Sequence, residues 1–206
     1  FRRVLFRSFY DVTQGAIYVD GVNVKDVTQH ELRDHIGYVP QKGTLFTGTI
    51  ESNLRYAKED ATEEELAKAA EIAQALEFIE EKPERYETAI TQGGTNVSGG
   101  QRQRLSIARA LVKKPEIYIF DDTFSALDFK TDAKLRKALN ILCQETKSTV
   151  LLVAQRISSI MHAERIVVLD KGEVVGIGNH EELMKSCEVY QEIAYSQLSK
   201  EELGNE

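Results

Sequence analysis

Cysteines, basic charge and long apolar runs are all scarce in this 206-residue sequence. The two cysteines, Cys143 and Cys187, lack metal-ligand spacing; a disulfide stays possible, but free thiols in a reducing compartment are favoured. The formal net charge of −7 argues against a nucleic-acid-binding surface, which normally carries a basic excess. The longest apolar run, Val150 to Ala154, is far shorter than the ~20 residues of a membrane-spanning helix. We therefore expect any membrane link to come from a partner or a further segment.

The order of apolar patterns predicts an α/β fold. Residues 1–8 are basic and apolar without a helical stripe, and we interpret them as a foreign or truncated segment before a domain at 9–206. Continuous apolar runs at 117–120 and 149–154 are typical of central strands in a parallel sheet covered on both faces. The mostly helical stretch at about 50–112 indicates a helical subdomain inserted into that core.

Shorter signals mark the remaining elements. Turn residues at Asp20-Gly21 and Asp170-Lys171-Gly172 predict two hairpins. A capping box, Thr62 with Glu65, predicts a helix whose apolar face extends to Leu76. Other expected elements are helices at 28–35, after Ser98, at 131–145 and from 181 onward, and a strand at 36–39.

Asp121 and Asp122 directly follow an apolar strand. The carboxyl ends of strands form the ligand-binding edge of α/β sheets, which favours a functional pair here. In nucleotide hydrolases the first such acid helps to hold Mg²⁺, and the second orients or deprotonates the attacking water. A solvated pair of aspartates at a strand end is the alternative.

The stretch Ser98-Gly99-Gly100-Gln101 places two glycines behind a capping serine. Glycines expose backbone N–H groups at a helix N-terminus, where the helix dipole also favours an anion. The pattern therefore indicates a phosphate contact, and an ordinary glycine-rich cap is the alternative.

Taken together, these patterns closely resemble the ABC ATPase family over about residues 9–198. The motifs, in family order, are Tyr38-Val39-Pro40-Gln41 (Q-loop), Ser98 to Arg104 with Ile107 to Leu111 (signature), the Asp121 strand (Walker B) and Ser125 to Asp128 (D-loop). Phe46 to Ile50 resembles the exporter form, and Ile90 to Gly94 lies where exporters contact their membrane domains. The resemblance implies a P-loop NTPase-like parallel-sheet core and a multidrug- or lipid-exporter type of module.

The resemblance also implies roles for particular residues. It implies ATP and Mg²⁺ as cofactors, with Asp121 and Gln41 near the metal and Asp122, Gln155 and Gln41 at the catalytic positions. Modules of this family pair head to tail. Ser98, Gly99, Gly100 and Gln101 would therefore contact ATP held by a second module, with Asp128 at the seam. The expected setting is the cytoplasmic face of the plasma membrane, with membrane domains fused upstream and no nucleic-acid partner.

Three departures from the family pattern change the expected activity. No G-x-x-x-x-G-K-[ST] P-loop occurs, so we expect the isolated chain, lacking the P-loop strand, neither to bind ATP tightly nor to hydrolyse it. Asp122 stands where Glu is usual, and Gln155 where a switch His is usual. Gln155 cannot become cationic or relay a proton. These substitutions resemble the degenerate half of a heterodimeric exporter, whose signature completes the partner's site.

Alternatives remain for two of these departures, Asp122 and Gln155, and for the function. Asp122 could be a conservative substitution that slows hydrolysis but leaves it working, and Gln155 could be a loop residue without a role in activity. A soluble ABC ATPase acting on nucleic acid or translation would call for a long coiled coil or tandem modules, and the sequence has neither. A regulatory partner that binds nucleotide without turnover is the third possibility.

Overall fold

The computed structural model describes residues 12–198, so the expected segment at 1–8 lies outside the described residues. The chain divides between Val153 and Ala154 into two compact units. Each unit is built around its own cluster of buried apolar side chains. We describe the two units separately.

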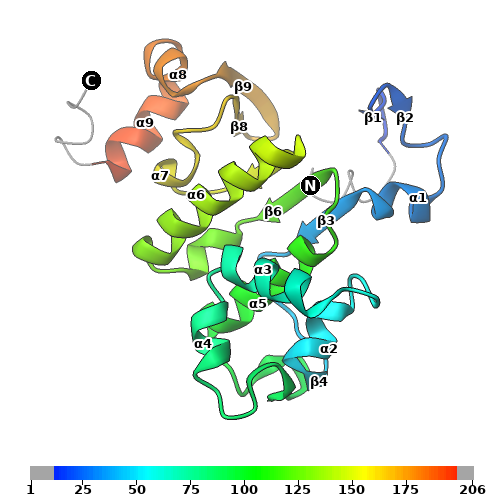
Figure 1. Cartoon of the computed structure of the whole chain (residues 1–206). Helices are drawn as coiled ribbons and strands as arrows, with labels where there is room; N and C mark the ends of the chain where they lie inside the picture. Colours follow the sequence, from blue (N-terminus) through cyan, green and yellow to red (C-terminus); the bar gives the residue numbers. More distant parts are fainter. Residues whose placement is uncertain (1–11, 199–206) are drawn as a thin grey trace. The chain divides into compact units, whose positions relative to one another are not determined.

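The first unit contains a three-stranded parallel sheet in the order β3-β6-β7. Its strands are β3 (Ile36–Val39), β6 (Ile117–Asp121) and β7 (Thr149–Val153), and helix α6 (Phe129–Thr146) makes the crossover from β6 to β7. Figure 1 shows β3 beside β6. The expected α/β class with a parallel sheet is confirmed. β6 is buried as expected of a central strand, whereas β7 lies at the edge of this described sheet and is half exposed.

Shorter elements precede this sheet. The first predicted hairpin is confirmed as β1 (Tyr18–Val19) and β2 (Val22–Asn23). Asp20 and Gly21 take the positive φ angles, 48° and 79°, that a two-residue hairpin loop requires. Helix α1 (Gln29–Asp34) begins after a capping box formed by Thr28 and Glu31.

Between β3 and β6 the chain is mostly helical. The helices are α2 (Ile50–Arg55), α3 (Glu63–Ile72), α4 (Leu76–Glu80) and α5 (Gly99–Val112), with 3-10 turns η2 (Arg85–Glu87) and η3 (Gln92–Gly94). Two short strands, β4 (Gly48–Thr49) and β5 (Ala89–Ile90), pair antiparallel within this stretch. Helix α5 packs against α2, α3 and β3, so the signature helix belongs to the same apolar core as the sheet.

One helix prediction was wrong in its extent. The capping box of Thr62 and Glu65 starts α3 as predicted, but α3 ends at Ile72, and Leu76 opens α4. Gln74 takes the left-handed conformation with φ 57°, which breaks the helix. Its carbonyl accepts a hydrogen bond from Arg104 of α5 at 2.6 Å. A contact from 30 residues away therefore stabilises a break that local periodicity does not reveal.

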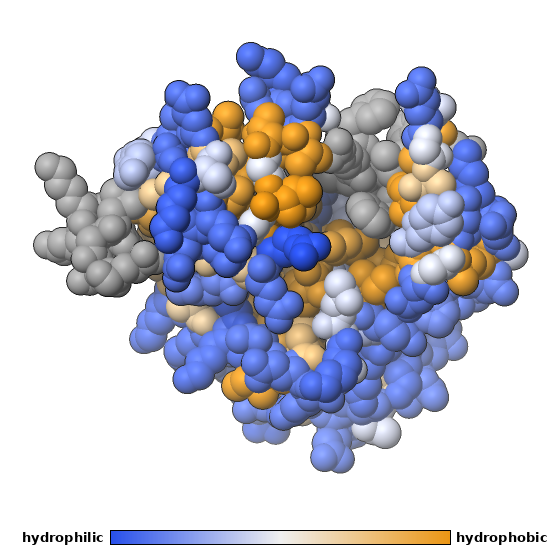
Figure 2. Space-filling view, turned by 90° about the horizontal axis from the view of Figure 1, so that it is seen from above, coloured by the Kyte–Doolittle hydropathy of each residue, from blue (hydrophilic) through white to orange (hydrophobic). Residues whose placement is uncertain are grey.

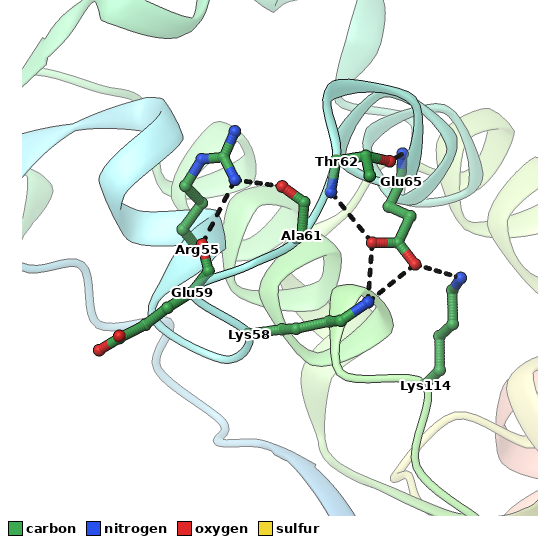
Figure 3. A network of polar contacts seen from close by, with 7 residues as sticks. All are labelled: Arg55, Lys58, Glu59, Ala61, Thr62, Glu65 and Lys114. Carbon is green, nitrogen blue, oxygen red and sulfur yellow. Dashed lines mark hydrogen bonds and ion pairs between the residues drawn. The ribbon is translucent and has the colours of Figure 1, made fainter.

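Glu65 joins α3 to the loop between α5 and β6 (Figure 3). Its carboxylate accepts hydrogen bonds from Lys58 at 2.9 Å and from Lys114 at 2.7 Å, besides closing the capping box with Thr62. These contacts, those of Lys114 first, lower the pKa of Glu65 to about 2. The carboxylate therefore stays ionised across the ordinary pH range.

The second unit comprises α7 (Ile157–Ile160), strands β8 (Ile166–Asp170) and β9 (Glu173–Gly178), α8 (His180–Ser186) and α9 (Glu188–Gln197). β8 and β9 form the second predicted hairpin, with Lys171 and Gly172 at positive φ. Tyr190 and Cys187 are buried in this unit's core. Cys187 and the half-buried Cys143 of the first unit are both free thiols, as favoured from the sequence.

Polar residues dominate the surface in Figure 2, where hydrophilic side chains surround smaller groups of apolar ones. Among residues 12–198, no helix combines the length and apolar character that crossing a membrane would require. The exposed large apolar residues include Phe46, four residues before α2 begins, and Tyr56, directly after it ends.

Candidate nucleotide-binding site

The carboxyl end of β6 brings together residues that lie about 80 positions apart. Asp121 and Asp122 are buried there, at 5% and 6% exposure. The Asp122 carboxylate accepts a hydrogen bond from the Gln41 side-chain amide at 2.9 Å, and Asp121 accepts one from the Tyr38 hydroxyl at 3.1 Å. Because β3 and β6 are parallel neighbours, the residues that follow them meet at one edge of the sheet.

The backbone at Asp122 is unusual. Its φ and ψ of 46° and 32° lie in the left-handed region, which aspartate tolerates better than most residues with a Cβ. Its N–H donates to the Val153 carbonyl at 2.8 Å, and its own carbonyl accepts from Ser125 at 2.8 Å. The backbone thus fixes the Asp122 side chain at the point where β6 gives way to a 3-10 turn, η4 (Thr123–Ala126).

Asp121, Asp122 and Gln41 offer oxygen donors, the ligands that Mg²⁺ prefers. Within residues 12–198 there is no cluster of three or more Asp, Glu, His or Cys side chains able to hold a metal ion. Mg²⁺ in nucleotide sites is usually bound by one or two carboxylates together with substrate phosphates and water. The donor set therefore fits a Mg²⁺ that arrives with a nucleotide better than a resident ion.

The signature stretch forms an exposed helix N-terminus. The Ser98 hydroxyl accepts from the Gln101 N–H at 3.2 Å, and the Gln101 side chain accepts from the Ser98 N–H at 3.1 Å, which completes a capping box. A Cβ added to Gly99 would have no atom within 4 Å, so the backbone there faces open space. The Ser98 hydroxyl also keeps its hydrogen available for donation to a ligand.

Asp128 caps the N-terminus of α6. Its carboxylate accepts from the Thr131 N–H at 3.0 Å, and this backbone hydrogen bond is the main cause of its lowered pKa. The side chain is exposed and attracts the charge of Arg104. In this structure the first role of Asp128 is therefore to begin a helix.

Gln155 lies in the second unit, two residues after β7 ends, and its side chain is exposed. Its carbonyl accepts from the Gln197 side chain at 2.9 Å, and the same side chain accepts from the Ile157 N–H at 2.9 Å. The C-terminal helix α9 thus fixes the backbone around Gln155.

Comparison with known proteins decides the family. Residues 4–125, more than half of the chain, match the ABC transporter family. The chain belongs to the ABC transporter family. The expected fold is confirmed by a solved bacterial Atm1-family ABC exporter with ATP bound. That structure superposes with a TM-score of 0.91 and is 37% identical, over 97% of this chain and 35% of the exporter.

Curated relatives of this ABC transporter chain are also similar over most of its length. An uncharacterized ABC transporter ATP-binding protein of Mycobacterium tuberculosis is 44% identical over 95% of the chain. An ATP-dependent lipid A-core flippase of Desulfotalea psychrophila is 46% identical over 91% of it. The chain spans about a third of these relatives, 33% and 32% of their lengths.

Two contacts at the candidate site of this ABC transporter chain were not predicted from the sequence. Tyr38, which lies inside the Q-loop motif, donates to Asp121. The buried side chain of Gln103, inside the signature motif, contacts the backbone of the Q-loop. Both residues were part of quoted motifs, but only three-dimensional packing reveals their partners.

Proposed function

We propose that this chain is the ATP-binding module of an exporter and couples ATP binding and hydrolysis to movement of a substrate across the membrane. Its family, its similarity to a lipid A-core flippase and its likeness to an exporter with ATP bound support this proposal. The module would act at the cytoplasmic face of the plasma membrane. There it would work with membrane-spanning domains, fused or separate, and a second nucleotide-binding module.

The hydrogen bond between Gln41 and Asp122 is the observation that carries the catalytic part of this proposal. It places an amide and a carboxylate together at the end of β6, beside Asp121. When bound, Mg²⁺ would neutralise phosphate charge and orient the nucleotide. Asp121 would help to hold the ion, Gln41 would lie near it, and Asp122 would orient or deprotonate the water that attacks the γ-phosphorus.

Two side chains support slow turnover at this site. The side chain of Asp122 is one methylene shorter than the usual Glu, and catalytic geometry tolerates little displacement. Gln155 can donate a hydrogen bond to a phosphate but cannot carry the positive charge or proton of a histidine. We infer a degenerate site that binds nucleotide better than it cleaves it, in a heterodimer with a different chain.

The signature residues would serve the other composite site. The open space at Gly99 and the available Ser98 hydroxyl suit a phosphate presented by a second module. Gly100 and Gln101 would extend this contact, and the exposed Asp128 would lie at the seam. This assignment makes the chain necessary for hydrolysis even if its own site is slow.

A contact surface for the membrane domains is also supported. Phe46 and Tyr56 are 44% and 68% exposed, with ring centroids 4.6 Å apart. Neighbouring exposed aromatic rings are typical of protein contact surfaces. We infer that this pair and the Ile90 to Gly94 segment face the membrane domains.

Site-directed variants of the full-length heterodimer test the assignment. Asp122→Glu combined with Gln155→His should raise single-turnover hydrolysis at this chain's site, because it restores the usual carboxylate reach and a protonatable group. Ser98→Ala should cripple hydrolysis at the partner's site. ATPase activity that survives Ser98→Ala would overturn the assignment of sites.

Thr62→Ala is the matched control for Ser98→Ala. Thr62 and Ser98 both close a capping box at a helix start, so each alanine variant removes a comparable cap worth about 1 kcal/mol. Only Ser98 belongs to the signature. Equal loss of ATPase activity in both variants would mean that helix stability, and not phosphate contact, explains the effect.

A further inference from the structure

Gln103 is a buried polar residue on the signature helix α5, five positions after Ser98 and 2% exposed. Burying an amide is unfavourable unless its polar atoms are hydrogen bonded. Both ends of the Gln103 amide bind backbone from the segment that follows β3. Its Oε1 accepts from the Gly43 N–H at 2.8 Å, and its Nε2 donates to the Pro40 carbonyl at 3.1 Å.

These two hydrogen bonds lie on either side of Gln41, whose own side chain holds the Asp122 carboxylate. Gln103 therefore fixes the backbone just before and two residues after the group that contacts the candidate catalytic acid. Because the Gln103 amide is planar and hydrogen bonded at both ends, it restrains the orientation of this backbone segment as well as its distance from α5. The position of Gln41 thus depends on the position of α5.

Gly43 adds a steric reason for this dependence. A Cβ at Gly43 would lie 2.8 Å from the Ser106 Oγ and 2.9 Å from the Gln103 Oε1, both on α5. The loop therefore lies directly against the helix surface, where a side chain does not fit. Arg109, further along α5, donates to the Thr44 carbonyl at 2.8 Å and extends the attachment.

Ser98 begins the same helix, about 7.5 Å along the helix axis from Gln103. Helix α5 is 14 residues long and would move as a rigid element, so displacement of its Ser98 end would also displace Gln103. We propose that Gln103 is a positioning residue that couples the signature end of α5 to the Gln41–Asp122 pair. Nucleotide binding by the partner at Ser98 would thereby adjust the catalytic carboxylate of this chain's own site. The proposal rests on the function proposed above.

Hydrogen exchange in the full-length heterodimer tests the coupling without requiring turnover at the Asp122 site. With saturating ATP and Mg²⁺, the amides of Gln41, Lys42 and Gly43 should become more protected in the wild type. Gln103→Leu removes both backbone hydrogen bonds and should abolish this nucleotide-dependent gain. Gln191→Leu is the matched control, because Gln191 also binds a backbone carbonyl, that of Met184, but belongs to the second unit.

A double-mutant experiment separates positioning from general destabilisation. With the partner's catalytic carboxylate removed, Gln103→Leu and Gln41→Ala should each lower the remaining single-turnover rate about tenfold, with the KM for ATP nearly unchanged. If Gln103 acts through Gln41, the double variant should be no slower than Gln41→Ala alone. Multiplied losses in the double variant would overturn the proposal.

The outcomes distinguish failure of this coupling proposal from failure of the proposed function on which it rests. Survival of ATPase activity in Ser98→Ala would refute the proposed function. Loss of activity in Ser98→Ala, together with unchanged nucleotide-dependent protection in Gln103→Leu, would refute only the coupling. If leucine prevents folding, Gln103→Glu keeps the shape and the acceptor for Gly43 and should lose the coupling partly, by losing the donor to Pro40.

Discussion

Asn53, in α2, secures the chain around Phe46 from a position only 1% exposed. Its Nδ2 donates to the carbonyls of Phe46 and Thr49 at 2.9 Å each, and its Oδ1 accepts from the Phe46 N–H at 2.8 Å. Asn53→Ala removes all three hydrogen bonds. At about 1 kcal/mol for each bond, the local free energy of opening should fall by about 3 kcal/mol. That corresponds to roughly 150-fold less protection from exchange.

Asn96 provides a matched comparison, because it also makes three hydrogen bonds. Its Nδ2 donates to the Ala89 carbonyl, and its Oδ1 accepts from the N–H and the hydroxyl of Thr91. Asn96 is exposed, so water can replace its bonds, and Asn96→Ala should lower local protection by less than about fivefold. Native-state hydrogen exchange of the full-length protein measures both. Equal losses of exchange protection in the two variants would refute the argument that burial determines the free-energy cost of removing these hydrogen bonds.

Two further predictions concern stability. The Glu65 carboxylate has a pKa of about 2, below its ordinary 4.5, so its contribution to stability is complete above pH 4.5 and is lost as pH falls toward 2. The difference in α3 exchange protection between wild type and Glu65→Gln should therefore shrink across that window, and a constant difference would contradict the assignment. Gly37→Ala places a Cβ 2.7 Å from the Pro115 Cγ, which should cost about 1–3 kcal/mol and lower β3 protection roughly 5- to 150-fold. Gly99→Ala, which adds its methyl group in open space, should leave β3 unchanged.

Local signals in the sequence were sufficient to predict whether a segment forms a helix, a strand or a turn. The Thr62–Glu65 box, the capping serine Ser98 and the turn at Asp20-Gly21 each depend on residues within three positions of one another, and the structure confirms all three. The apolar run at 117–120 likewise becomes a buried strand. Interactions this short are recorded directly in the residue order, so a single sequence is enough to predict them.

Contacts between residues far apart in the sequence could not be predicted from such local signals. The break at Gln74 depends on Arg104, and the Gln103 contact with Gly43 joins residues 60 positions apart. The family resemblance alone predicted Gln41 near the Mg²⁺ and the attacking water, and its hydrogen bond to Asp122 depends on parallel pairing of β3 with β6. The spacing of apolar residues in the sequence does not indicate which backbone groups a buried side-chain amide contacts, because these contacts depend on packing in three dimensions.

The left-handed backbone at Asp122 has a consequence for how this protein can change. Aspartate enters that conformation more readily than glutamate, because its short polar side chain can bond locally. A longer carboxylate at residue 122 would thus gain reach toward water while holding a less favourable backbone. Under the function proposed above, the rate of hydrolysis and the resistance of the fold to heat are therefore opposed at this single position.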